Sequence, residues 1–115
     1  MIDAPQPRTA PTVRREQSYL LDNAWQHARA RLSLLESRLD PGTIFLLNRL
    51  GIRPGWRCLV VGAGGGSITE WLCQQTGPEG HVVATDIDTR FIDALDYPNL
   101  EVRRHDIVAD ELKTV

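Results

Sequence analysis

Little in this sequence supports a metal site, a disulfide framework or a membrane-spanning helix. The 115 residues include two cysteines, Cys58 and Cys73, and three scattered histidines, His27, His81 and His105. Without a C-x-x-C spacing or a histidine cluster, we expect two buried, reduced thiols and no metal ion. No apolar run approaches the roughly 20 residues that cross a bilayer, and the N-terminus lacks the basic-then-apolar layout of a secretory signal. We therefore expect a cytoplasmic protein with no membrane partner.

The composition is that of one soluble globular domain, because 42% of the residues are hydrophobic and 24% are charged. Charge is uneven along the chain: nine of the thirteen basic residues lie at or before Arg57, and ten of the fifteen acids lie after it. The early basic residues alternate with acids and form no block, which favours a solvated helix face over a nucleic-acid-binding surface. We expect no nucleic-acid partner.

A flexible arm is predicted at the N-terminus, over residues 1–15. Pro5, Pro7 and Pro11 lie there among small polar residues. Such a composition cannot bury enough apolar surface to offset the entropy of ordering the chain.

Two helices are predicted to follow, as a helical lead-in or cap over residues 16–51. In the longer one, apolar residues recur at spacings of four and three and share one stripe: Leu21, Trp25, Ala28, Leu32, Leu35 and Leu39. Asp40 followed by Pro41 is typical of an N-cap and a first helical position, and Gly51 is typical of a helix end. The sequence therefore predicts a second, shorter helix over residues 41–50.

Residues 52–115 predict an alternation of strands and helices. Strands are expected at 56–61, 81–85 and 100–104, with helices at 67–75 and 89–95. The first strand is a continuous apolar run suited to burial on both faces, whereas the third alternates apolar and charged residues, as a half-exposed strand near an edge does. Right-handed crossovers would place the strands in the order 3-2-1. We expect an α/β fold with a partial Rossmann-like parallel sheet.

A glycine cluster joins the first strand to the helix after it. Gly62, Gly64 and Gly66 alternate there, with Gly65 between the last two. Free N–H groups and the positive end of a helix favour electron-rich ligand groups at such a turn. The alternative is a tight turn that only reverses the chain, but four glycines exceed what turning requires. We interpret the turn as part of a site for a nucleoside-containing cofactor.

Carboxylates follow the next two strands. Asp86 ends the second strand twenty positions after Gly66, where it can accept hydrogen bonds from both hydroxyls of a ribose. The alternative role for Asp86 is a helix N-cap, which Asp88 can supply instead. Asp106 ends the third strand in the same way. Polar or glycine-rich elements are thus expected at one edge of the sheet after all three strands.

Residues 52–107 resemble the class I S-adenosylmethionine-dependent methyltransferases. The likeness lies in Pro54-Gly55 before the first strand, the Gly62-x-Gly64-x-Gly66 turn and Asp86. It implies S-adenosyl-L-methionine as cofactor, methyl transfer to an unidentified small-molecule acceptor, and no assigned catalytic residue. By family analogy the methionine part would face Gly62, Ala63, Gly64 and Gly66, the ribose hydroxyls Asp86, the adenine face Ile87 and the adenine amino group Asp106.

Two departures from the family pattern stand out. Many members carry an acid two positions before the first glycine, where this chain has Val60, and that acid usually supports the methionine end of the cofactor. The family fold also continues for several strands, so residues 52–115 would be the N-terminal half of such a domain in a truncated chain. Residues 58–61 would then form an open sheet edge, at which we expect a homodimer or another association.

Two other interpretations are open. A nicotinamide-dependent oxidoreductase would use G-x-G-x-x-G with the same acid after the second strand, but the third glycine position holds Ser67. The other is a non-catalytic, truncated fragment that dimerises through its open edge. The residues 20–43 also look like the helical lead-in of bacterial small-molecule methyltransferases, in which such helices cap the cofactor and help to shape the acceptor pocket.

Overall fold

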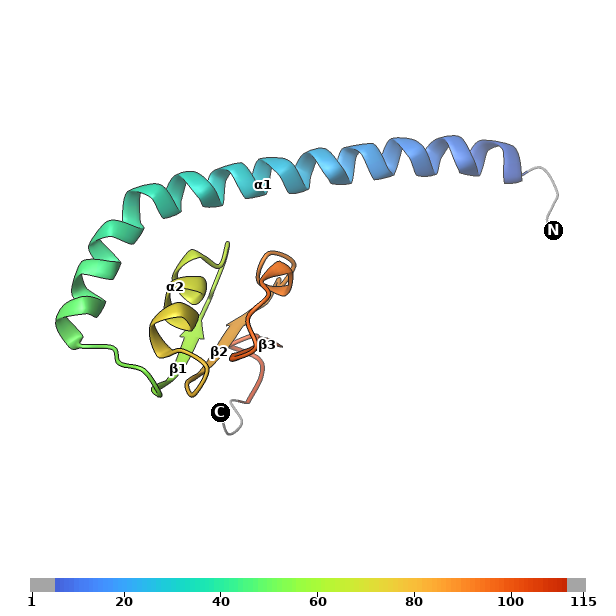
Figure 1. Ribbon diagram of the computed structural model, residues 1–115. Helices are drawn as coiled ribbons and strands as arrows, with labels where there is room; N and C mark the ends of the chain where they lie inside the picture. Colours follow the sequence, from blue (N-terminus) through green and yellow to red (C-terminus); the bar gives the residue numbers. More distant parts are fainter. Residues whose placement is uncertain (1–5, 112–115) are drawn as a thin grey trace. The chain divides into compact units, whose positions relative to one another are not determined.

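The computed structural model describes residues 6–111 (Figure 1). The chain divides into two compact units, Met1–Arg31 and Leu32–Val115. In the first unit the described residues belong to helix α1 (Gln6–Leu50). The second unit contains the rest of α1 and the alternating strands and helices. The expected division into an arm, a helical lead-in and an α/β portion stays a prediction.

Helix α1 is continuous through Asp40 and Pro41, so the prediction of two separate helices is wrong. Pro41 fits because its ring holds φ near the helical value, at the cost of one backbone hydrogen bond. Proline inside a helix usually bends it, and the green part of α1 curves in Figure 1. The predicted end is confirmed: Gly51 has a φ of +83°, and its N–H donates to the carbonyls of Leu47 and Asn48.

The residues predicted as an arm overlap the start of α1. Helix α1 already begins at Gln6, so residues 6–15 are helical, whereas residues 1–5 lie outside the described part of the chain. Pro7 is compatible with this start because the first four N–H groups of a helix have no acceptor within it.

The three strands form one parallel sheet in the order β1-β2-β3, which confirms the predicted order 3-2-1. The elements after α1 are β1 (Arg57–Val61), α2 (Ser67–Thr76), β2 (His81–Asp86), the short 3-10 helix η1 (Ile92–Ala94) and β3 (Leu100–Arg104). In the register, Val60 of β1 lies beside Ala84 of β2, and Ala84 beside Val102 of β3. The C-terminal ends of all three strands therefore meet at one edge of the sheet, as the alternation predicted.

The hydrophobic core lies between the sheet and α2. Leu72 and Cys73 of α2 pack with Val82 of β2, and Leu47 of α1 joins this cluster. The central strand β2 is buried from Val82 to Thr85, because it has a neighbouring strand on each side.

Strand β1 is not buried on both faces, so that prediction is wrong. Its residues alternate between half-buried and exposed, and the exposed fractions of Leu59 and Val61 are 36% and 50%. Among the described strands β1 pairs with β2 alone. Half-buried Cys58 and Val60 pack against the core that α2 covers, and the next residue along a strand points to the opposite face.

Both cysteines are free, which confirms the prediction of reduced thiols, although only Cys73 is fully buried. Burial, followed by the nearby Glu70 carboxylate, raises the pKa of Cys73 to about 11. Burial also raises the pKa of Cys58. A thiol with a raised pKa is a weak nucleophile at neutral pH.

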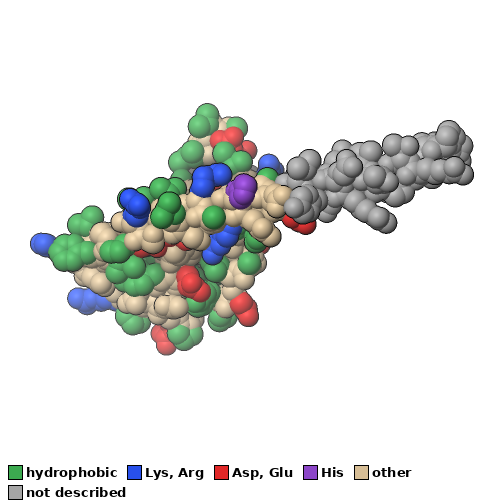
Figure 2. All heavy atoms as spheres, turned by 90° about the horizontal axis from the view of Figure 1, so that it is seen from above, with side chains coloured by type: hydrophobic (Ala, Val, Ile, Leu, Met, Phe, Trp, Pro, Cys, Tyr) green, Lys and Arg blue, Asp and Glu red, His purple; other side chains and the backbone are tan. Residues whose placement is uncertain are grey.

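Several large apolar side chains lie at the surface of α1 (Figure 2). Leu34, Phe45, Leu46 and Leu50 are each more than half exposed. No helix within residues 6–111 combines the length and the apolar character needed to cross a membrane.

Candidate functional site

The glycine turn at residues 62–66 links β1 to α2, as the sequence predicted. Gly62, Gly64 and Gly66 have φ values of +70°, +58° and +92°, which L side chains rarely adopt. A Cβ at Gly66 would lie 3.0 Å from a methyl carbon of Leu95 and 3.1 Å from one of Ile92. Backbone conformation and packing therefore account for Gly66, whereas no Cβ clash explains Gly62.

Three N–H groups of this turn, and that of Ser67 directly after it, donate to acceptors inside the chain. Two carbonyls and two carboxylates accept from them: Ala63 donates to Thr85 O (2.9 Å), Gly64 to Asp86 Oδ2 (2.8 Å), Gly66 to Ala63 O (3.1 Å) and Ser67 to Glu36 Oε2 (3.1 Å). The expectation of free N–H groups is wrong for these four residues. The reason lies in tertiary structure, which brings the two carboxylates to the turn from other elements.

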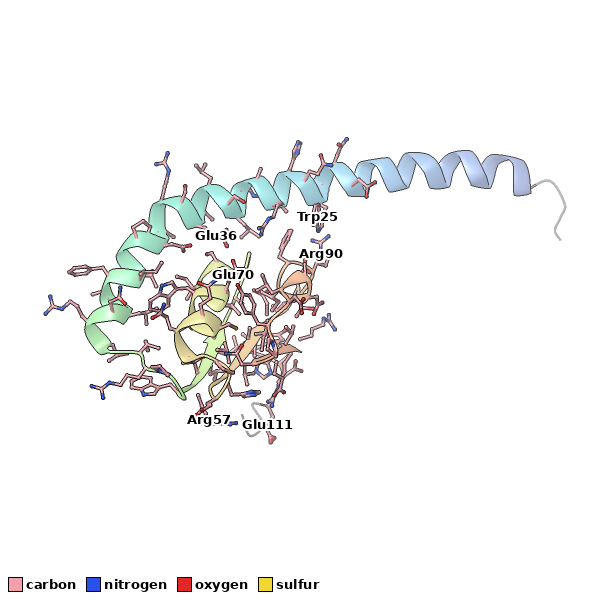
Figure 3. All side chains as sticks on the ribbon, viewed as in Figure 1. Trp25, Glu36, Arg57, Glu70, Arg90 and Glu111 are labelled. Atoms are coloured by element: carbon pink, nitrogen blue, oxygen red, sulfur yellow. The ribbon has the colours of Figure 1, made fainter. Side chains whose placement is uncertain are left out.

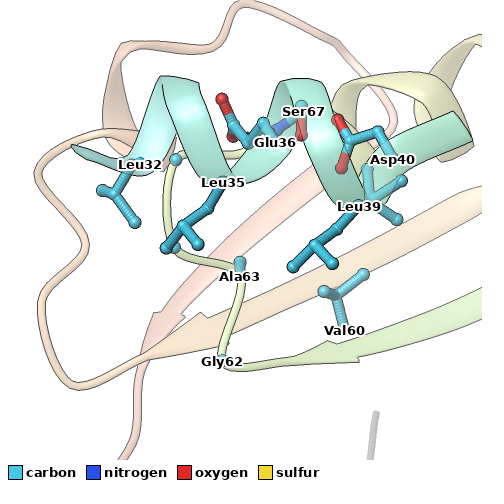
Figure 4. Close-up of a pocket in the computed structure, with 12 residues that line it drawn as sticks. Leu32, Leu35, Glu36, Leu39, Asp40, Val60, Gly62, Ala63 and Ser67 are labelled. Carbon is cyan, nitrogen blue, oxygen red and sulfur yellow. Dashed lines mark hydrogen bonds between the residues drawn. The ribbon is translucent and has the colours of Figure 1, made fainter. Parts of the chain in front are cut away.

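A cavity of about 300 Å³ lies against the turn (Figure 4). Helix α1 lines it with Leu32, Leu35, Glu36, Leu39 and Asp40. The opposite wall comes from Val60, the glycine turn and the first residues of α2. Figure 4 shows the side chains of Leu35 and Leu39 directed from α1 toward the end of β1 and the turn. The helix stripe predicted from sequence thus lines a hollow here, and the exposed fractions of Leu35 and Leu39 are 52% and 62%.

The charged side chains that line this cavity are all acidic. Glu36 and Asp40, both half-buried, are its acidic residues, and none of the described residues that line it is Lys, Arg or His. The Glu36 carboxylate accepts a hydrogen bond from the N–H of Ser67, the first residue of α2 (Figure 4), and Figure 3 shows Glu36 on the side of α1 that faces α2 and the strands. A carboxylate there is stabilised by the positive end of the helix. A cationic or hydrogen-bond-donating ligand group fits such a wall better than an anion does.

Asp86 lies at the end of β2, where the sequence predicted it. Its Oδ2 accepts from the N–H of Gly64 at 2.8 Å, and its Oδ1 accepts from the N–H of Asp88 at 3.1 Å. An ionised carboxylate offers about four acceptor positions, so two bonds leave room for further donors. The proposed role of Asp86 in binding ribose hydroxyls stays a prediction.

Two further predicted site residues, Ile87 and Asp106, line a second hollow of about 280 Å³. Arg104, Ala109 and Asp110 complete its lining. Asp106 Oδ1 accepts from the N–H of Val108 at 2.9 Å and from that of Ala109 at 3.3 Å, so this carboxylate organises the turn after β3. Ile87 is 58% exposed. A role for either residue at the adenine ring stays a prediction.

The structure therefore places the predicted residues in two groups. Gly62, Ala63 and Gly64 line the first hollow, while Gly66 and Asp86 line neither. Sequence reasoning missed Glu36 and Asp40. A signal was present, because Leu32, Glu36 and Asp40 recur every four residues and thus share one helix face.

No protein-family model matches the chain, and no curated protein matches it either. Among solved structures it is similar to a SAM-dependent methyltransferase from Aquifex aeolicus, with 27% sequence identity and a TM-score of 0.54. The match covers 68% of this chain and 47% of the other, so the chain spans about half the length of that structure. The resemblance predicted from the glycine turn and Asp86 is thereby confirmed: the chain is structurally similar to an S-adenosylmethionine-dependent methyltransferase.

Proposed function

We propose that this chain binds S-adenosyl-L-methionine and serves as the cofactor-binding part of a methyltransferase. One observation carries the proposal: the hollow at the junction of β1 and α2 combines a glycine turn, leucine side chains and two carboxylates, without a basic residue in its described lining. S-adenosylmethionine has a sulfonium and an ammonium group against a single carboxylate, so its net charge suits this wall. The likeness to a SAM-dependent methyltransferase supports the same ligand.

The same observation weighs against a dinucleotide. A Rossmann dinucleotide site places the pyrophosphate on free N–H groups at the start of the first crossover helix. In this chain the N–H of Ser67 is already bonded to Glu36, and Asp40 adds a second negative charge to the cavity. A phosphate could bind the N–H of Ser67 only by displacing the Glu36 carboxylate from it. The phosphate would also be repelled by the negative charges of Glu36 and Asp40.

The chain's own residues would bind and orient the cofactor. The backbone at Gly62 and Gly64 would admit a ligand to close range, Asp86 would accept from the ribose hydroxyls, and Leu35 and Leu39 would offer an apolar surface. When bound, S-adenosylmethionine supplies a methyl group that an acceptor's lone pair attacks at carbon, while the electrons of the broken C–S bond stay on sulfur. Such a reaction depends chiefly on holding the reactants in line. We propose a small molecule as the acceptor, because residues 20–43 resemble the helical lead-in of bacterial small-molecule methyltransferases.

Equilibrium binding tests the proposal. We expect the chain to bind S-adenosylhomocysteine, measured by isothermal titration calorimetry, and not to bind NADH. Asp86→Asn should weaken S-adenosylhomocysteine binding about tenfold, because a hydrogen bond to a charged group is worth about 1.5 kcal/mol or more. Asp96→Asn is the matched control, since Asp96 is exposed and lines neither hollow. Binding of NADH without S-adenosylhomocysteine would contradict the proposal.

The exposed edge favours a second candidate function, a non-catalytic module that associates through β1. Leu59 and Val61 are exposed on this strand, which pairs on one side only among the described strands. We propose a homodimer or another association through residues 58–61, because an exposed, apolar edge strand is a template for pairing with another chain.

A further inference from the structure

We propose that Glu36 of α1 recognises the ammonium group of the cofactor's methionine part. The inference rests on the proposed function, because it assigns a binding residue within the same cavity. Glu36 lies 26 positions before the first glycine of the turn. Neither the glycine turn nor the acids after the strands pointed to it.

The contacts of Glu36 place its carboxylate at the cavity and hold it there. Its Oε2 accepts from the N–H of Ser67 at 3.1 Å, a bond between residues 31 positions apart. This bond anchors the side chain against the N-terminus of α2, where the helix dipole stabilises a negative charge. A carboxylate accepts up to about four hydrogen bonds, so the anchored group keeps the capacity to bind a donor in the cavity.

The surroundings favour a charged donor. Asp40 lies one helical turn after Glu36 and lines the same hollow. No Lys, Arg or His is among the described residues of that lining, so neither carboxylate is neutralised from within the cavity. A partly enclosed pair of negative charges attracts a cation more strongly than one charge in open solvent does, because the local dielectric is lower. An alkylammonium group supplies both the charge and three N–H donors.

The side chain of Val60, near the end of β1, has no acceptor for an ammonium group, so an acceptor must come from another element such as α1. Val60 ends the core-facing side of β1 and lines the same hollow as Glu36, but it offers only a hydrocarbon surface. The methionine end of the ligand carries an ammonium group that needs an acceptor when it leaves water. Glu36 provides that acceptor from the opposite wall of the cavity (Figure 4).

Two ligands that differ in the amino-acid part test the inference. S-adenosylhomocysteine carries the ammonium group, whereas 5′-methylthioadenosine has the same nucleoside and thioether without it. We expect Glu36→Gln to weaken binding of S-adenosylhomocysteine about tenfold, as loss of a charge-assisted hydrogen bond does, and to leave binding of 5′-methylthioadenosine unchanged. Glu79→Gln is the matched control, because Glu79 is exposed in the turn after α2 and does not line the cavity.

Each outcome is decisive. If Glu36→Gln weakens the binding of both ligands equally, or of neither, the role of Glu36 is overturned. The proposed function still stands in that case, provided that the wild-type chain binds S-adenosylhomocysteine. If the wild-type chain binds neither ligand, both proposals fall. A second measurement uses only the wild-type chain and so does not depend on whether the Glu36→Gln variant folds. The wild-type chain should bind a des-amino analogue of S-adenosylhomocysteine about tenfold more weakly than the parent compound. Equal affinity for the two overturns the inference.

Discussion

At the scale of single residues, the hydroxyl groups of two buried threonines are in contrasting environments. Thr69 of α2 and Thr85 of β2 are each 1% exposed. Thr85 Oγ1 donates to the carbonyl of Val60 at 2.9 Å, whereas Thr69 Oγ1 has no hydrogen-bond partner among the described residues. A buried polar group without a partner loses its bonds to water and gains none in return.

Replacing each threonine with valine should therefore have opposite effects. We expect Thr69→Val to raise the free energy of unfolding by about 0.5–1 kcal/mol, because an unpaired hydroxyl becomes a methyl group. Thr85→Val should lower it by about 1–2 kcal/mol, because the partly buried carbonyl of Val60 loses the hydroxyl as a donor. Urea denaturation followed by circular dichroism measures both changes. A similar loss in the two variants would show that the Thr69 hydroxyl has a partner.

The glycine turn was located correctly from the sequence, but all of its glycines were interpreted as part of a cofactor site. The structure separates them: Gly62 and Gly64 line the cavity, while Gly66 lies against Ile92 and Leu95. A glycine in a sequence indicates an unusual backbone conformation or a close approach. It does not say whether ligand or protein comes close, because that depends on which side chains the fold brings to the turn.

At the scale of elements, the side chain of Asn99, the residue directly before β3, forms hydrogen bonds with the C-terminal end of α2. Its side-chain Nδ2 lies 2.9 Å from the carbonyls of Cys73 and Gly77, and 3.2 Å from Thr76 Oγ1. The same two carbonyls also accept backbone bonds, Cys73 O from the N–H of Gly77 and Gly77 O from that of Gly80, so Asn99 adds a second donor where α2 ends. Because Asn99 is 7% exposed, water reaches these groups poorly.

We expect Asn99→Ala to lower the free energy of unfolding by about 1–2 kcal/mol, since the carbonyls of Cys73 and Gly77 each lose one of two donors and keep only a backbone N–H. Asn48→Ala is the matched control, because Asn48 is exposed on α1 and no side-chain bond to it is part of this network. Denaturant unfolding of the two variants measures the difference. If both lose the same small amount, Asn99 does not cap α2 in solution.

Elements were predicted well where the local pattern was strong. The three strands and α2 were expected within about one residue of their observed bounds, because apolar runs bounded by glycine and proline predict such elements well. Asp40-Pro41 was misleading, since proline is compatible with both the first position of a helix and a bend inside one.

At the scale of the whole molecule, the open edge at β1 predicts association. We expect the wild-type chain to form dimers or larger species as its concentration rises, measured by light scattering after size-exclusion chromatography. Val61→Lys should restore a monomer, because a charge on an edge strand opposes pairing with another chain. Val108→Lys adds the same charge at a residue that is 92% exposed and outside the sheet. A wild-type chain that stays monomeric at all concentrations, or equal effects of the two substitutions, would contradict this prediction.

The sequence alone determined the order of the three strands and α2, the parallel sheet and the place of the glycine turn, because these depend on local patterns and on the handedness of crossovers. The helix expected over residues 89–95 is in the structure only the three-residue 3-10 helix η1. Only the tertiary structure decided that the N–H groups of the turn are already bonded and that Glu36 and Asp40 face the same cavity. The physical reason is distance along the chain. The bond from Ser67 to Glu36 joins residues 31 positions apart, and no local periodicity encodes which carboxylate a folded helix will bring to a turn.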